Sequence, residues 1–408
     1  MSAIVTLDIY QSAGIGVAAL LFGMYLTKHV PFLKRYCIPA PVSGGIIVSL
    51  ISLVLYYSGI ECSFDSTIKD LCMMLFFTAV GFQSDLKVLR QGGRPLLIMI
   101  LLVAVLIVFQ NLISVGIARG LDLDPLFGMA AGSIPMSGGH GTSGGFSPLL
   151  EQLGLKGASS ITMTAATFGL VAGSLLGGPL GERLIRKNNL AEQSGSSDTM
   201  RGIEASVASP DAKETQTKEA SFRDGVLSAS LLLITMALGT GLSKLLNLTG
   251  ITFPTYFGSL IMACILRNAA GLSPQTSKII CMGKIVSIGD ICLQLFLGMA
   301  MASLRLWELA SLALPLCLIL LTQVTFMAVY SAFIAFPLLG RDYDSAVLVS
   351  GLCGFGLGAT PNAMANMSAV CYKYHYAVNP FIIIPIIGVM FADLINTGVI
   401  TIFLNVIH

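Results

Sequence analysis

Charged residues are scarce in this sequence. Of its 408 residues only 11% are charged, whereas 55% are hydrophobic and the mean hydropathy is +0.84. Soluble domains carry about 25% charged residues, so this chain cannot be an ordinary soluble globule. Its formal charge is only +2, and we expect no nucleic-acid partner.

The sequence also lacks the patterns that mark several kinds of enzyme and metal site. It contains no G-x-x-x-x-G-K-[ST] loop for nucleotide-driven transport and no H-E-x-x-H zinc motif. Nine cysteines are scattered without a CxxC pair or a Cys/His cluster, which argues against a disulfide framework or a zinc site. We therefore predict a protein that is not an enzyme and has no cofactor. If it transports a solute uphill, the energy must come from an ion gradient.

Long apolar runs fill most of the chain. A helix that crosses the hydrocarbon core of a bilayer takes about 20 apolar residues, and exposed sheet edges are excluded there. We therefore predict an all-α polytopic membrane protein. Asp8 precedes the first run, without the basic n-region or cleavage site of a signal peptide, so we interpret that run as a retained span. The predicted spans are 7–27, 37–57, 70–86, 95–118, 158–182, 225–244, 252–270, 285–303, 307–337 and 379–406.

The distribution of basic residues predicts the orientation. Residues 186–224 are rich in charge and poor in large apolar side chains, which is typical of a solvated linker. If the N-terminus lies outside and the spans alternate, this linker and most basic connections are cytoplasmic, as the positive-inside rule requires. Both termini are then external. Only five of the 23 basic residues remain outside, namely Lys69, Arg119, Lys156, Lys244 and Arg305.

The linker separates two halves, 1–185 and 225–408, that resemble each other. Asp70-Leu-Cys-Met-Met-Leu-Phe76 recurs as Asp290-Ile-Cys-Leu-Gln-Leu-Phe296, at an offset of 220 and with four of the seven positions identical. Short apolar matches can arise by chance, but each half also holds five full spans. Because five is odd, the second half begins on the opposite side of the membrane. We predict two inverted-topology repeats, an architecture of secondary transporters.

Each half also contains a segment that is too polar and too rich in glycine to face lipid. The first is Gly-Ser-Ile-Pro-Met-Ser-Gly-Gly-His-Gly-Thr-Ser-Gly-Gly-Phe-Ser-Pro at 132–148, and the second, equally glycine-rich, lies at 351–367. Non-helical backbone at membrane depth is tolerated only inside protein or along a water-filled cavity. We predict re-entrant hairpins near 126–150 and 344–368 that enter from opposite sides. Tight helix packing through small residues is the alternative interpretation of the glycines.

The hairpin tips are the predicted binding elements. Glycine lets the backbone of an unwound tip approach a ligand closely, and Pro361 can begin the returning half-helix. The N-terminus of a half-helix carries about half a positive charge and free N–H groups, so it can hold a carboxylate without a buried arginine. Free carbonyl and hydroxyl oxygens at such tips suit sodium.

A few polar residues inside the spans are further candidates. Asp393 lies in mid-span, where a carboxylate costs about 2.5 to 3.5 kcal/mol, so we expect a coupling cation or a substrate ammonium as its partner. Asn396 shares its helix face. His140 can bind substrate, relay protons or donate to a neighbouring carbonyl. Gln110 and Gln323 can line the cavity or hydrogen-bond one helix to another.

At these segments the sequence resembles the bacterial sodium/glutamate symporters. The resemblance is carried by SerGlyGlyHisGlyThr at 137–142, GlyPheGlyLeuGlyAlaThrPro at 354–361 and LeuTrpGluLeuAlaSerLeuAlaLeuPro at 306–315, and it covers both hydrophobic halves. It implies sodium-coupled import of L-glutamate across the bacterial inner membrane by a homodimer. It also implies alternating access of the elevator type, in which a core holding both hairpins moves against a scaffold. The external termini would then be periplasmic.

From the residues and the resemblance together, we expect the two tips to hold an acidic amino acid and nearby oxygens to hold sodium. A carrier of another small organic anion, driven by sodium or protons, is the first alternative, and an ion channel filtered by the hairpins is the second. The expected substrate-binding residues are Ser137, Gly138, Gly139, His140, Gly141, Thr142, Thr360, Pro361, Asn362 and Asp393. The expected sodium-binding residues are Asp393, Asn396, Gly358, Gln110 and Gln323.

Overall fold

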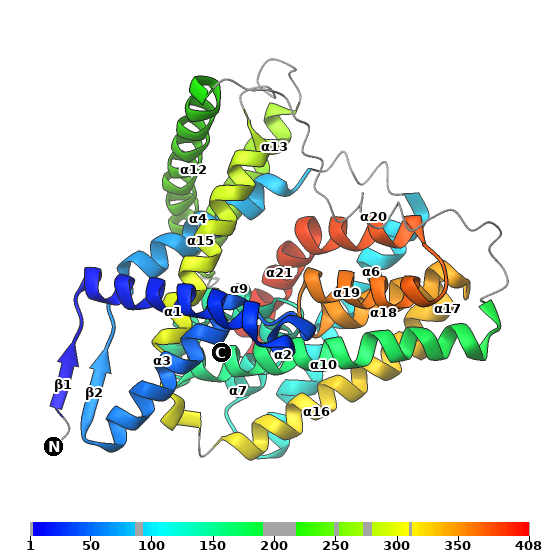
Figure 1. Cartoon of the computed structure of the whole chain (residues 1–408), viewed down its shortest axis with the longest axis horizontal. Coiled ribbons are helices and arrows are strands. Elements are labelled where there is room, and N and C mark those ends of the chain that lie inside the picture. The colour runs from blue at the N-terminus through cyan, green and yellow to red at the C-terminus, as the bar shows by residue number, and fades with distance from the viewer. Residues whose placement is uncertain are drawn as a thin grey trace.

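The computed structural model of the chain describes residues 3–85, 93–190, 218–248, 253–271, 280–309 and 312–407. Most of these residues are helical, as Figure 1 shows. The central part of the predicted linker lies outside the described residues, and helices reach into its two ends at Lys187 and Lys218.

The first half of the chain contributes long helices and one broken segment. Asp8 starts the first helix through a capping box, because its carboxylate accepts from the Gln11 backbone N–H at 2.8 Å while the Gln11 side chain accepts from the Asp8 N–H. The described helices are α1 (Ile9–His29), α2 (Pro31–Arg35), α3 (Ala40–Tyr57), α4 (Thr67–Gln83), α6 (Gly93–Gly120), α7 (Pro125–Ala130), α8 (Ser133–Met136), α9 (Gly139–Gln152) and α10 (Ala158–Lys187).

The second half repeats this plan and adds two π-helical turns. The turns Ser331–Ala335 and Ile387–Phe391 join α16 to α17 and α20 to α21, so each pair runs as one continuous helix. Such turns occur frequently at functional sites. The described helices are α12 (Lys218–Asn247), α13 (Phe257–Ala270), α15 (Met282–Ala302), α16 (Ala313–Tyr330), α17 (Phe336–Leu339), α18 (Tyr343–Gly356), α19 (Thr360–Lys373), α20 (Val378–Ile386) and α21 (Ala392–Ile407).

The helices agree with a membrane protein. Each predicted span overlaps a described helix or a continuous helix pair, but α13 begins at Phe257 and α16 at Ala313, five and six residues after the predicted starts. Two shorter apolar helices are Phe257–Ala270 and Ala392–Ile407. Within the described residues, seven helical segments are long and apolar enough to cross a bilayer, namely Ile9–His29, Ala40–Tyr57, Gly93–Gly120, Ala158–Lys187, Phe222–Asn247, Met282–Ala302 and Ala313–Leu339.

The helices pack into two bundles. The first bundle contains α1, α3 and α4 from the first half and α12, α13 and α15 from the second. The second bundle contains α6 to α10 and α16 to α21. Figure 1 shows α4, α12, α13 and α15 running together, with α10, α18 and α19 in another direction. Each bundle therefore combines elements of both halves of the chain.

Two short strands were not predicted. β1 (Ala3–Thr6) and β2 (Ile60–Ser63) pair in parallel, and the Leu7 N–H extends the pairing by donating to the Ser63 carbonyl oxygen at 2.9 Å. The all-helical prediction is wrong for these residues, because strands of four residues are too short to show the alternation that marks a strand in sequence. The pair ties the chain before α1 to the α3–α4 connection.

Candidate functional site

Both glycine-rich segments form broken helices. In the first, α7, α8 and α9 follow one another with interruptions at 131–132 and 137–138. In the second, residues 357–359 separate α18 from α19, and these two helices pack against each other. Glycine lowers the cost of leaving helical geometry at such points. The N–H groups at the breaks bond back to the preceding turn, as in Gly138 to the Ser133 carbonyl oxygen at 3.0 Å and Ala359 to the Gly354 carbonyl oxygen at 3.2 Å.

The two breaks lie against each other. Gly139 has a φ of +58°, a left-handed conformation that favours glycine. A side chain there would also approach the Gly358 carbonyl oxygen of the other segment to 2.9 Å. At Gly388, in the π-helical turn before α21, an added Cβ would collide with the Thr360 hydroxyl. Glycine at positions 139 and 388 therefore lets the tips and this turn come together.

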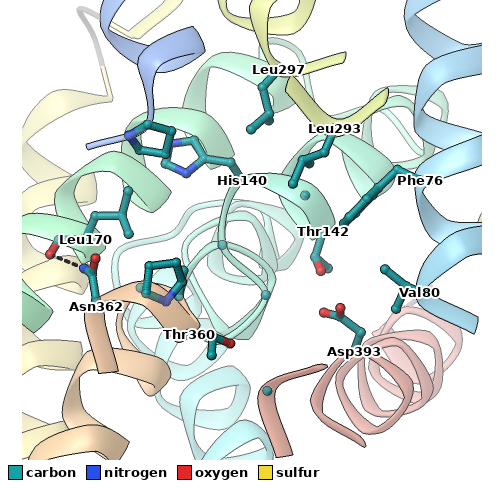
Figure 2. A pocket seen from close by; sticks show the side chains of 18 of the residues that line it. Phe76, Val80, His140, Thr142, Leu170, Leu293, Leu297, Thr360, Asn362 and Asp393 are labelled. Carbon is teal, nitrogen blue, oxygen red and sulfur yellow. Dashed lines mark hydrogen bonds between the residues drawn. The ribbon is translucent and has the colours of Figure 1, made fainter. Parts of the chain in front are cut away.

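A cavity of about 370 Å³ lies between the tips (Figure 2). In the part of the chain that the structure describes, no lysine or arginine lines it. All the expected substrate-binding residues line this one cavity, and so does Gly358; they are Ser137, Gly138, Gly139, His140, Gly141, Thr142, Thr360, Pro361, Asn362 and Asp393.

The helices α9 and α19 begin at the cavity without a capping side chain. Gly138 and Ala359 stand before them, whereas Asp124 and Asp342 cap α7 and α18 by accepting from backbone N–H groups at 2.8 Å. The first turn of a helix has N–H groups without intrahelical partners and about half a positive charge. The two uncapped starts therefore give the cavity a positive potential that suits anionic groups.

Asp393 lies in the first turn of α21 and turns its carboxylate into the cavity. Figure 2 shows it facing the hydroxyl of Thr142. No described lysine or arginine forms an ion pair with it, so this charge favours a bound cation. Asn396 lies behind the cavity wall, and its Nδ2 donates to the Ser133 carbonyl oxygen at 3.2 Å.

His140 is held by a neighbouring helix. Its ring is only 6% exposed, and Nε2 lies 3.0 Å from the Thr167 hydroxyl of α10. That hydroxyl donates its single hydrogen to the Met163 carbonyl oxygen at 2.9 Å. Nε2 must therefore be the donor to Thr167, which leaves Nδ1 as an acceptor. The arrangement favours a fixed ring in the cavity wall over a ring that donates to a carbonyl.

Asn362 presents an unpaired acceptor in the cavity. Its Nδ2 donates to the Leu170 carbonyl oxygen at 2.7 Å, the dashed line of Figure 2. The side chain is fully buried, and Oδ1 has no hydrogen-bond partner among the described residues. Because a buried unpaired acceptor is costly, this oxygen is suited to accept from a ligand ammonium or to bind a cation.

Gln110 and Gln323 lie behind the tips rather than in the cavity wall. Gln110 Oε1 accepts from the Ser137 hydroxyl at 2.6 Å, and its Nε2 donates to the Gly356 carbonyl oxygen at 2.7 Å. Gln323 Nε2 donates to the Gln110 carbonyl oxygen at 2.7 Å and to the Ser114 hydroxyl at 2.5 Å. Both glutamines are fully buried. These bonds favour hydrogen bonding between elements over sodium binding for Gln110, whereas Gln323 Oε1 is buried without a described hydrogen-bond partner.

The cavity also contains residues that the sequence analysis did not include among its candidates. Phe76 and Gln83 of α4 and Asp290 of α15 line it from the first bundle. The signal that points to them is the repeated segment itself, since Asp70–Phe76 lies in α4 and Asp290–Phe296 in α15. The similarity of the two segments draws attention to both helices, but it does not predict that they face the two glycine-rich segments.

The segment 141–145 fits the G-x-S-x-G spacing of a hydrolase nucleophile. In that motif the serine sits on a strained strand-to-helix turn. Here Ser143 lies inside α9 and donates to the Thr162 carbonyl oxygen at 3.4 Å. The match therefore does not mark a catalytic serine.

A glycine face of α9 packs against aromatic side chains of the first bundle. The rings of Phe77 and Tyr256 stack with centroids 3.7 Å apart, and Phe146 meets Tyr256 edge-on at 5.9 Å. A Cβ at Gly145 would lie 2.5 Å from Tyr256 Cε1 and 3.1 Å from Phe77 Cε2. The stack therefore has no room for a side chain at this position.

We expect Gly145→Ala to destabilise the protein by about 1 to 3 kcal/mol, the usual cost of overpacking. The measurement is the thermal unfolding temperature of the purified protein in detergent. Gly116→Ala is the control, because nothing lies within 4 Å of its added Cβ and alanine favours a helix over glycine. If both variants unfold at the wild-type temperature or above, the aromatic side chains move to accommodate the methyl group, and the expectation is wrong.

Known proteins are similar to this sequence over nearly its full length. A family model described as sodium/glutamate symporter matches residues 5–376. The sodium/glutamate symporter of Escherichia coli (strain K12) is 40% identical over 402 residues, which cover 98% of each chain. The sodium/glutamate symporter of Haemophilus influenzae is 34% identical over 406 residues, 99% of this chain and 98% of its own.

One solved structure is similar at a much lower level. The sodium proton antiporter MjNhaP1 from Methanocaldococcus jannaschii aligns over 98% of this chain and 95% of its own. The sequence identity is 14% and the TM-score is 0.43. We draw no conclusion about this chain from so low a similarity.

Proposed function

The chain belongs to the sodium/glutamate symporter family, and on this basis we propose that it imports L-glutamate together with sodium across the bacterial inner membrane. It is a transporter and not an enzyme. One observation carries the proposal: two uncapped helix starts face a single cavity, and no described lysine or arginine lines it. Sodium would be the coupling ion, and the transport would need no cofactor.

Glutamate presents two carboxylates and one ammonium, and the cavity offers a counterpart for each. The start of α9, at Ser137–Thr142, would bind one carboxylate. The start of α19, at Thr360–Asn362, would bind the other through the N–H and hydroxyl of Thr360, because Pro361 has no N–H and the Asn362 N–H donates to the Ala359 carbonyl oxygen at 3.0 Å. The ammonium would meet the unpaired Oδ1 of Asn362 or the carboxylate of Asp393. This pairing explains how an acidic amino acid can be bound without a basic side chain.

The two bundles support an elevator-type cycle of alternating access. The tips, Asp393 and the glutamines behind the tips all belong to the second bundle, whereas α4 and α15 of the first bundle supply the facing wall. Movement of the second bundle past this wall would expose the cavity first to one side of the membrane and then to the other. The first bundle would be the scaffold, through which we expect the homodimer to form.

We also propose that the two halves are inverted repeats and that the two hairpins are re-entrant. Each half supplies three helices to the first bundle, and a helix, a broken segment and another helix to the second. This equal division supports the internal duplication. The linker would be cytoplasmic and both termini periplasmic. Cys37, Gln83 and Asp290, which line the cavity, then belong to the cytoplasmic half, so the cavity would open inward.

The test is the uptake of radiolabelled L-glutamate into proteoliposomes that hold the purified protein. We expect saturable accumulation with an inward sodium gradient and none with an equal potassium gradient. Accumulation driven by a proton gradient, or blocked by succinate more strongly than by unlabelled glutamate, would instead favour a carrier of another organic anion. A continuous ion current without saturable substrate movement would favour a channel.

We expect Thr360→Ala to raise the KM for glutamate by about tenfold. The hydroxyl lies at the first residue of α19 on the cavity wall, and a hydrogen bond to a charged group contributes about 1.5 to 3 kcal/mol. Initial uptake rates over a range of glutamate concentrations measure the change. Thr360→Ser retains the hydroxyl and should stay near the wild-type KM. Equal KM values for the alanine and serine variants would remove this hydroxyl from substrate binding.

A further inference from the structure

Four buried oxygen atoms near Asp393 have no hydrogen-bond partner. They are the side-chain oxygens of Thr142, Tyr256, Asn396 and Thr397. None of these residues is more than 1% exposed. None of the four oxygens has a hydrogen-bond partner of normal geometry among the described residues, although Thr142 interacts with the Asp393 carboxylate and Tyr256 with Thr397. An unpaired polar atom in the interior costs about 1 to 3 kcal/mol. Four of them in one region therefore call for a ligand that pairs with oxygen.

Three of the side chains share one face of α21. Asp393, Asn396 and Thr397 stand at spacings of three and four residues, which places them side by side on a helix. The π-helical turn Ile387–Phe391 comes directly before this helix and sets the direction in which the face points. The carboxylate and two of the unpaired oxygens are therefore presented together.

The other two oxygens belong to α9 and to the residue that precedes α13. Figure 2 shows the Thr142 hydroxyl of α9 turned toward the Asp393 carboxylate. A Cβ placed at Gly138 would lie 2.6 Å from both Thr142 Oγ1 and Asn396 Nδ2, so these two side chains flank the same point. The Tyr256 hydroxyl neighbours Thr397 and lies close enough to Asp393 to interact with its charge.

The Tyr256 hydroxyl is held firmly in its place. Its ring is stacked on Phe77 at 3.7 Å and is met edge-on by Phe146. Tyr256 stands directly before α13, which belongs to the first bundle, whereas Thr142 and Asp393 belong to the second. The oxygens thus come from α9, from α21 and from the residue that precedes α13, and so from both bundles.

We propose that Asp393, Thr142, Asn396, Thr397 and Tyr256 form the site of the coupling sodium ion. A hard cation prefers oxygen ligands, and a carboxylate with neutral oxygens suits a single positive charge. The ion would neutralise Asp393 and pair the unpartnered oxygens. This inference rests on the proposed sodium symport and adds ligands, Tyr256 and Thr397, that lie outside the cavity wall.

Such a site would explain how sodium and glutamate are coupled. Thr142 lies in the first turn of α9, at the tip that we propose holds a substrate carboxylate. An ion bound to Thr142 and Asp393 fixes this tip before glutamate binds. Because Tyr256 comes from the other bundle, the ion also couples the site to the position of the second bundle against the first.

The test measures sodium binding without glutamate. Purified full-length protein is heated in detergent while sodium replaces choline at constant ionic strength, and the sodium concentration for half-maximal stabilisation is recorded. We expect Thr397→Val and Tyr256→Phe each to raise that concentration by at least about tenfold, as the loss of a group at a metal site does. Thr397→Ser keeps the oxygen and should bind sodium like the wild type.

Thr401→Val is the matched control. It makes the same exchange on the same helix, at another buried hydroxyl without a described partner, two turns beyond Asp393. We expect it to leave the sodium response unchanged. If the Thr397 hydroxyl bound no ion, its replacement by a methyl group would leave the sodium concentration for half-maximal stabilisation unchanged.

The outcomes separate this inference from the proposed function. If the wild type responds to sodium and both Thr397→Val and Tyr256→Phe respond at the same concentration, the site is wrong and the symport stands. If the wild type shows neither a sodium response nor sodium-driven uptake, the proposed function fails and the site fails with it. A weakened response in Thr401→Val equal to that in Thr397→Val would also overturn the site.

Discussion

Asp393→Asn should abolish sodium-driven glutamate uptake and leave the protein folded in the membrane. The carboxylate faces the cavity between the two tips and has no described ion-pair partner. Its function in our proposal is to bind a cation, and asparagine removes the charge while keeping the shape. A charge at the bilayer centre costs about 2.5 to 3.5 kcal/mol, so its loss should not weaken the fold.

The measurement for Asp393→Asn is initial uptake into proteoliposomes, with membrane insertion and thermal unfolding followed in parallel. Uptake should fall to the level of protein-free liposomes, and the unfolding temperature without sodium should stay at or above that of the wild type. Asp70→Asn is the control, because Asp70 lies in the first turn of α4 and accepts from the Ser66 hydroxyl at 2.9 Å, away from the cavity. Normal sodium-dependent uptake by Asp393→Asn would remove the carboxylate from the mechanism.

The sequence predicted the tips and Asp393 because their residue types are unusual where they stand. A run such as that at 137–142 cannot face lipid, and a mid-span carboxylate needs a partner, so composition alone marks both as interior. The structure brings these residues to one cavity. The residue types alone were sufficient to predict that these residues lie in the interior. The free-energy cost of placing such a residue in lipid does not depend on the details of the fold.

The roles of other residues could not be predicted, because they depend on contacts between distant segments. A buried glutamine such as Gln110 is equally suited to line a cavity or to join helices, and only its bonds to Ser137 and Gly356 distinguish the two. Tyr256 looks like an ordinary aromatic residue before a helix. Its importance comes from the approach of α13 to α4 and α9, which no periodicity in the sequence records.

Gln110→Leu should raise the KM for glutamate by about tenfold to hundredfold. One amide joins the two broken segments, because Oε1 accepts from Ser137 in the first and Nε2 donates to Gly356 in the second. Leucine has a similar size but leaves the hydroxyl and the carbonyl buried without partners. Each unpaired group costs about 1 to 3 kcal/mol, and about 1.4 kcal/mol corresponds to a tenfold change in affinity.

The effect should appear in KM because the tips lose their common support while their own residues stay intact. Uptake at saturating glutamate should fall less than uptake at low concentration, and more sodium should be needed for half-maximal rate. Gln152→Leu, at the exposed end of α9, should behave like the wild type. A normal KM in Gln110→Leu, with the protein folded, would mean that the tips hold their arrangement without this bridge.

Gln323→Leu should have a smaller effect of the same kind. Gln323 donates to the Gln110 carbonyl oxygen and to the Ser114 hydroxyl, but within the described residues it forms no hydrogen bond to either tip. Loss of the Gln323 amide therefore affects the cavity only through Gln110. The KM of the double variant should be only slightly higher than that of Gln110→Leu alone. If the two KM changes instead multiply, the glutamines act independently, and Gln323 must contact the substrate or sodium in another state of the transport cycle.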